Sequence, residues 1–200
     1  MKEKLLRPPI RVGDIIGFTG YNRISAGVVL GSLGVPFYSL SHVGIIGECG
    51  GEKLLFESST LGPEPCVIQG KTFDGTKAVC LDDKLAGYKG RAWHYPLYRS
   101  LYEHESKRLN EFLISHVGIS YDKIGAFRAG GFVFSWIQSW FRDQDFSRLF
   151  CSEYCAAAYA DIGLFNSESA SMWSPCQLVH KLRSTHILKK PKRLVCGQSA

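Results

Sequence analysis

The sequence lacks any long, uninterrupted apolar run. Its most apolar stretch, residues 126–141, is broken by an arginine, two serines and a glutamine, and no window approaches the roughly eighteen apolar residues that a membrane-spanning helix needs. The first residues are basic, but the pair Pro8 and Pro9 interrupts them before an apolar run of signal-peptide length accumulates. We therefore expect a soluble or peripheral cytoplasmic protein, and a phage, viral or injected origin stays open.

Modules for nucleic-acid binding are also absent from the sequence. It has no glycine–aromatic RNA-recognition strand, no zinc-finger spacing and no basic helix that runs into heptads, so no nucleic-acid partner is expected. The net charge is +6, and the basic residues are concentrated only in KKPKRL, residues 189–194. This basic tail predicts a solvated surface or a peripheral contact with an anionic membrane.

The seven cysteines form no short regular framework and include no C-x-x-C pair. Reduced thiols are the expected state, and a structural zinc site built from paired ligands is disfavoured. A zinc site made by His42, Cys151 and Cys155 is the remaining metal alternative. We predict no metal and no cofactor.

The 200 residues contain no repeat and no low-complexity linker. The hydrophobic fraction of 45% is that of an ordinary globular protein. We therefore predict one domain over residues 1–200, with its core at about 13–182 and the basic tail after it.

Strand patterns dominate the first half of the chain and helix patterns the second. Short β-branched or aromatic runs predict the strands, and SHVGIIG and EKLLFES are joined by the turn ECGG as a hairpin. Apolar residues at helical spacing predict the helices, and Ser174 is the expected N-cap of the last one, with Pro175 at its first position. Strands followed by helices indicate an α+β fold. The expected strands are 14–19, 41–47, 52–58, 66–69, 78–81 and 92–95, and the expected helices are 24–33, 109–117, 151–162 and the one that follows Ser174.

His42 opens an otherwise apolar strand. Alternation places it on the same face as Gly44 and Ile46, and the missing side chain of Gly44 predicts room for a group to approach the imidazole. The residue is either a core histidine bonded to a backbone carbonyl or a general base on a rigid strand. Glu57, on the adjacent strand with apolar neighbours, is either the carboxylate that orients this imidazole or an edge glutamate facing water.

Cys151 lies where the apolar periodicity of a helix begins, so we predict it in the first helical turn. Free backbone N–H groups and the helix dipole stabilise a thiolate there and can hold an oxyanion. The alternative is a small core residue, and this is the interpretation for Cys155, one turn later on the same stripe.

Six motifs, in this order, resemble the circularly permuted papain-like hydrolases, specifically the YiiX-like branch of the NlpC-type superfamily. They are GDIIGFTG, SHVGIIG, LFESS, YDKIGA, FCSEYCAAAY and SPCQLV. The similarity runs from about residue 13 to about residue 182. It implies an antiparallel sheet that carries the catalytic histidine and packs against a helix with the catalytic cysteine at its N-terminus. By this resemblance Cys151 is the nucleophile, His42 its base and Glu57 the residue that orients the imidazole.

The resemblance implies cleavage of an amide, isopeptide or ester bond through a covalent acyl-enzyme. Relatives act on peptidoglycan peptides, on other amides and on lipid esters, so the expected substrate is a peptide, an isopeptide or an acyl lipid. The alternative is a catalytically silent module of the same fold that binds lipids or peptides.

Two stretches depart from the resemblance. Residues 125–146 are rich in large aromatic side chains that match no motif, and they predict either core or a surface that meets acyl chains or a membrane. Cys176, in SPCQLV, stands where a small or polar residue is expected, and we interpret it as structural.

Overall fold

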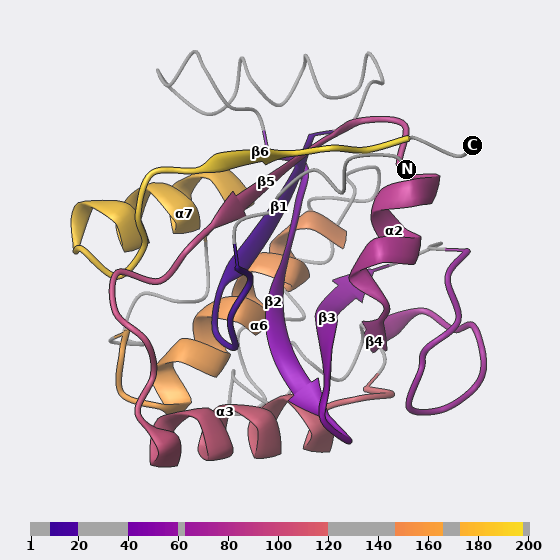
Figure 1. Cartoon of the computed structure of the whole chain (residues 1–200), viewed down its shortest axis with the longest axis horizontal. Helices are drawn as coiled ribbons and strands as arrows, with labels where there is room; N and C mark the ends of the chain where they lie inside the picture. Colours follow the sequence, from indigo (N-terminus) through magenta and orange to yellow (C-terminus); the bar gives the residue numbers. More distant parts are fainter. Residues whose placement is uncertain (1–8, 20–39, 60–62, 120–146, 166–172, 198–200) are drawn as a thin grey trace, which may run out of the picture.

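The computed structural model describes residues 9–19, 40–59, 63–119, 147–165 and 173–197. Within these ranges the protein is α+β, with a six-stranded, fully antiparallel sheet in the order β4-β3-β2-β1-β5-β6 and four helices (Figure 1). The strands are β1 (Ile15–Thr19), β2 (His42–Cys49), β3 (Glu52–Ser59), β4 (Gly75–Val79), β5 (Arg91–Tyr95) and β6 (Lys192–Leu194), and the helices are α2 (Leu81–Gly87), α3 (Glu103–Ser115), α6 (Ser147–Asp161) and α7 (Pro175–Ser184).

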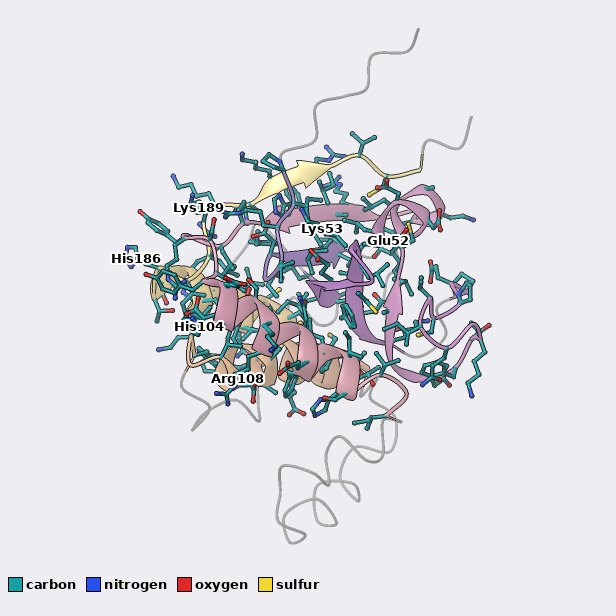
Figure 2. The ribbon with its side chains drawn as sticks, turned by 60° about the horizontal axis from the view of Figure 1, so that its bottom comes forward. Glu52, Lys53, His104, Arg108, His186 and Lys189 are labelled. Carbon is teal, nitrogen blue, oxygen red and sulfur yellow. The ribbon has the colours of Figure 1, made fainter. Side chains whose placement is uncertain are left out.

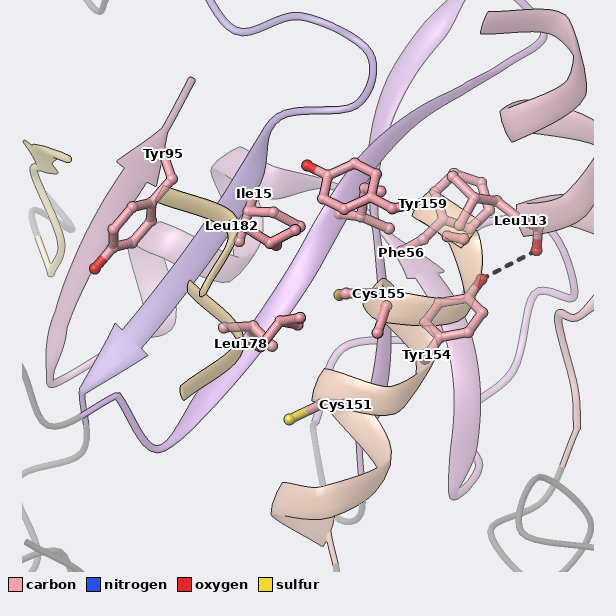
Figure 3. Close-up of a cluster of buried hydrophobic side chains, with 14 of the residues drawn as sticks. Ile15, Phe56, Tyr95, Leu113, Cys151, Tyr154, Cys155, Tyr159, Leu178 and Leu182 are labelled. Carbon is pink, nitrogen blue, oxygen red and sulfur yellow. Dashed lines mark hydrogen bonds between the residues drawn. The ribbon is translucent and has the colours of Figure 1, made fainter. Parts of the chain in front are cut away.

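The two faces of the sheet bury different clusters because side chains alternate along each strand. Ile15, Val43 and Phe56 belong to the larger cluster, which includes side chains of α3, α6 and α7 (Figure 3). Ile46 and Leu55 belong to the smaller cluster, which includes Leu81 and Leu85 of α2. The sheet is therefore covered by three helices on one face and by α2 on the other. None of the helices in the described ranges is long and apolar enough to cross a membrane.

Several predicted elements are confirmed. β2 and β3 form the expected hairpin, whose turn needs two glycines because Gly50 and Gly51 adopt φ values of 62° and 82°. The helix that follows Ser174 begins as predicted, since the Ser174 side chain accepts a hydrogen bond from the Gln177 N–H.

Other predictions are wrong in position or type. Residues 66–69 form a turn closed by an isolated bridge between Cys66 and Lys71, not a strand. The strand expected at 78–81 ends at Val79, and Leu81 begins α2, which was not predicted. The predicted helix at 24–33 and the aromatic segment at 125–146 lie outside the described residues.

The basic tail is also different from the prediction. Its residues Lys192–Leu194 form β6 and pair with β5, so the tail completes the sheet instead of following the core (Figure 1). Leu194 is buried in the α2-side cluster, whereas Lys192 and Arg193 stay exposed. One buried leucine in a basic run is enough to dock the strand, since the lysine and arginine side chains can reach solvent from an edge strand.

Candidate active site

His42 is the first residue of β2, at one end of the sheet. It is paired with Phe18 of β1, and the two rings lie 5.8 Å apart between centroids. Alternation directs His42 to the α2 side of the sheet, together with Ile46. Its side chain keeps 19% of its surface exposed, so the imidazole is not sealed in the core.

Glu57 lies on β3 directly opposite Gly44, and therefore diagonally across from His42 on the same face. Its side chain is fully buried, and Oε2 accepts a hydrogen bond from Nε2 of His42 over 2.9 Å. Of the two interpretations of Glu57, the geometry excludes an edge glutamate facing water. The structure brings His42 and Glu57 together, while their catalytic roles remain a prediction.

Gly44 does not provide the open space that its sequence position predicts. A Cβ at this position would lie 2.7 Å from Cδ1 of Leu55 and 2.9 Å from the carbonyl oxygen of Phe56. The room beside the imidazole is therefore occupied by the neighbouring strand. The glycine allows β2 and β3 to approach closely next to Glu57.

Cys151 does not lie in the first turn of its helix. α6 begins at Ser147, which makes Cys151 its fifth residue, and the backbone N–H of a fifth residue bonds within the helix. The predicted stabilisation of a thiolate or an oxyanion by free N–H groups at Cys151 is therefore wrong, and the dipole acts mainly on the turn before it. The periodicity misplaced the helix start because the first four residues of α6 precede its apolar stripe.

Cys151 nonetheless reaches His42. The thiol is fully buried and belongs to the α6-side cluster, whereas His42 projects from the α2 side, so the two groups meet where β2 begins. The imidazole has both an electrostatic interaction and a hydrogen bond with Cys151. Because Glu57 occupies Nε2, Nδ1 is the ring nitrogen left for the thiol. The structure thus joins the three residues that sequence reasoning selected.

The charges of this cluster favour a protonated imidazole. Burial lowers the pKa of His42, but the negative charges of Cys151 and Glu57, together with hydrogen bonds to both, raise it to about 9. Burial raises the pKa of Glu57, but His42 and Lys84 outweigh it and hold that pKa well below its usual range. At neutral pH the arrangement therefore supports a protonated imidazole that is backed by a carboxylate and hydrogen-bonded to Cys151.

Lys84 is a component of the site that sequence reasoning missed. It lies on α2 with only 9% of its side chain exposed, and its Nζ donates to Oε1 of Glu57 over 2.8 Å. Two aspartates precede it, and a charged run in a short helix is typical of a solvated face, so no local pattern indicated its burial.

The other two cysteines near the site are structural in position. Cys155 is fully buried one turn after Cys151, and burial raises its pKa well above the usual value (Figure 3). Cys176 lies in the first turn of α7, where its Sγ accepts a hydrogen bond from the Leu40 N–H over 3.0 Å. Within the described ranges, no group of three or more histidine, cysteine, aspartate or glutamate side chains is arranged to hold a metal ion, so the zinc alternative gains no support there.

A second histidine–carboxylate pair lies nearby and was not singled out from the sequence. Nε2 of His94 on β5 is 2.7 Å from Oδ2 of Asp14, and both residues are fully buried. The carboxylate of Asp14 also accepts hydrogen bonds from the backbone N–H groups of Arg11 and Leu97, over 2.9 Å and 2.8 Å. Asp14 thus ties the chain before β1 to β5 through His94 and to the chain after β5 through Leu97.

Comparison with known proteins gives a limited result. No protein family and no curated protein matches the chain. Among solved structures, it is similar to one described as the crystal structure of metalloprotein yiiX from Escherichia coli O157:H7, DUF1105. The sequence identity is 20%, the match covers 94% of this chain and 89% of that chain, and the TM-score is 0.48.

Proposed function

We propose that the protein is a thiol hydrolase or acyltransferase that cleaves an amide, isopeptide or ester bond. The observation that supports this proposal is the convergence of Cys151, His42 and Glu57 from three separate elements into one hydrogen-bonded row. A nucleophile, a base and a carboxylate that orients the base are the parts that covalent acyl transfer requires. The permuted papain-like architecture belongs to the same proposal.

In the proposed reaction the thiolate of Cys151 attacks the acyl carbon and forms a tetrahedral intermediate. The imidazolium of His42 gives its proton to the departing amine or alcohol as the carbon–heteroatom bond breaks, which leaves a thioester on Cys151. Neutral His42 then takes a proton from water or from an acceptor alcohol or amine, which attacks the thioester and restores the thiolate. Glu57 keeps Nε2 bonded throughout and stabilises each imidazolium.

The substrate class stays within peptides, isopeptides and acyl lipids. A peripheral membrane contact is part of the proposal because Lys189, Lys190, Lys192 and Arg193 are exposed along β6 and the segment before it, and an anionic bilayer attracts such groups. Figure 2 shows Lys189 near His186 at the periphery of the molecule. A silent binding module is the second candidate, and the full burial of the Cys151 thiol is the observation that favours it.

The test is labelling with a panel of peptidyl and acyl-lipid electrophiles, followed by mass spectrometry of the adducts. We expect one adduct, on Cys151, which disappears in Cys151→Ala and persists in the matched control Cys155→Ala. The preferred electrophile identifies the acyl group. Labelling spread evenly over the seven cysteines, or confined to the four partly exposed ones, Cys49, Cys80, Cys176 and Cys196, would reject the enzyme and leave the binding module.

A further inference from the structure

The two carboxylate oxygens of Glu57 have different partners. Oε2 bonds to His42, while Oε1 accepts from Nζ of Lys84 over 2.8 Å and from the hydroxyl of Ser59 over 3.3 Å. A buried carboxylate with one free oxygen could rotate about its last side-chain bond and offer either oxygen to the imidazole. With Oε1 held by a cation, only Oε2 faces His42.

Lys84 is itself held in place by several contacts. Its Nζ lies 3.4 Å from Oε2 of Glu64 and 5.9 Å from the centre of the Phe18 ring, which also neighbours His42. Burial lowers the pKa of Lys84, but the charges and hydrogen bonds of Glu57 and Glu64 outweigh this effect and raise it. The ammonium is therefore charged over the whole pH range in which a thiol would react.

The groups around Glu57 form a row of alternating charge. From Cys151 outward the order is His42, Glu57, Lys84 and Glu64. Lys77 of β4 lies opposite Glu57 in the sheet, and the charges of Lys84, Glu64 and Asp74 also act on it. Burial raises the pKa of the nearby Tyr88, whereas its hydrogen bond with Ser41 and the charge of Lys84 lower it.

From this geometry we infer that Lys84 is a positioning residue for the reaction at Cys151: it fixes the orientation of Glu57 and balances its charge, so that the thiolate–imidazolium pair forms at lower pH. The inference rests on the proposed function. A nearby positive charge favours the ionised form of an acid. If the ammonium of Lys84 is removed, the negative charge of Glu57 is balanced by His42 alone, and ionisation of the Cys151 thiol becomes less favourable. The loss therefore acts through Glu57 and His42, and Lys84 need not touch the substrate.

The experiment measures the rate of iodoacetamide alkylation at Cys151 by mass spectrometry between pH 5 and pH 9, which needs no knowledge of the substrate. Lys84→Met removes the charge at similar length, Lys84→Gln removes it but keeps a hydrogen-bond donor, and Lys84→Arg keeps the charge. The matched control is Lys53→Met, because Lys53 is an exposed lysine of the same strand as Glu57 and its Nζ bonds the Ile10 carbonyl.

We expect the acidic midpoint of the alkylation profile to rise by about one pH unit in the neutral variants, which is about a tenfold slower reaction below the midpoint. Lys84→Arg should recover most of the shift, and Lys53→Met should show none. An unshifted profile in whichever neutral variant folds, or an equal shift in Lys84→Arg, overturns the inference. A wild-type Cys151 no faster than the other cysteines would instead reject the proposed function.

Discussion

The pairs His42–Glu57 and His94–Asp14 lie on the same side of the sheet, on either side of β1. His42 pairs with Phe18 and His94 with Ile16, two residues apart on that strand. In both pairs Nε2 bonds a fully buried carboxylate, over 2.9 Å and 2.7 Å. The two pairs therefore do not differ in their position in the sheet or in their central hydrogen bond.

The difference lies in the groups that complete each pair. Asp14 accepts hydrogen bonds from two backbone N–H groups and lies 3.9 Å from the Arg11 guanidinium, and the buried Nδ1 of His94 finds no hydrogen-bond partner among the described residues. Glu57 is surrounded by the side chains of Lys84 and Ser59, and the second nitrogen of His42 is left for Cys151. The backbone bonds make the first pair a cross-link between chain segments, whereas the contact of its imidazole with a thiol makes the second pair suited to move a proton.

The largest expected effect separates the two histidines. His42→Ala should slow alkylation and acylation of Cys151 by a factor of about 100 or more, because the thiolate loses its cation and the leaving group loses its proton donor. His94→Ala should leave the rate per folded molecule unchanged, as should His104→Ala, an exposed control on α3 (Figure 2). Equal losses in His42→Ala and His94→Ala would remove the distinction.

The next effect concerns stability, and here the larger change is expected at the His94–Asp14 pair. Asp14→Asn should lower the free energy of unfolding by about 3 kcal/mol, because it disrupts the buried bond to His94 and weakens two bonds from backbone N–H groups. Urea denaturation measures this change. Asp161→Asn, which removes the surface partner of Arg108, is the control and should cost about 1 kcal/mol at most. A loss no larger than the control would mean that the Asp14 pair does not tie the segments together.

The pH dependence of stability should report the His42 site. Its pKa of about 9 lies above the ordinary value of 6.5, so the folded state binds this proton more tightly than the unfolded chain does. The stabilisation is complete below about pH 6.5 and is lost as the pH rises through 9, a change of up to about 3 kcal/mol. The free energies of unfolding of the wild type and His42→Ala should differ most below about pH 6.5 and least above about pH 9. A difference that stays the same at every pH would contradict a raised pKa of His42.

The smallest effect tests the two cysteines of α6. Cys155→Ala should cost about 1 kcal/mol through a small cavity and leave the alkylation rate at Cys151 within about twofold of the wild type. Thermal denaturation and the labelling assay measure the two quantities on one sample. Complete loss of reactivity in a folded Cys155→Ala protein would mean that the wrong cysteine was assigned as nucleophile.

The local pattern of the sequence determined most of the strands and the identities of three residues in the site. Strand patterns in residues 41–58 placed His42 and Glu57 on adjacent strands of a hairpin, whose register the structure then gives. Helical periodicity placed Cys151 and Cys155 on one buried stripe. These features depend on neighbours a few residues away, so local spacing is sufficient to predict them.

Only the tertiary structure decided which charged and polar groups are buried together. The burial of Lys84, the pairing of β6 with β5, the space filled beside Gly44 and the cross-link between His94 and Asp14 all depend on residues far apart in the chain. No periodicity records such contacts, because a charged side chain is stable in the core only when a distant partner neutralises it. Sequence therefore supplied Cys151 and His42, which we propose as nucleophile and base, and packing supplied the charged side chains around them.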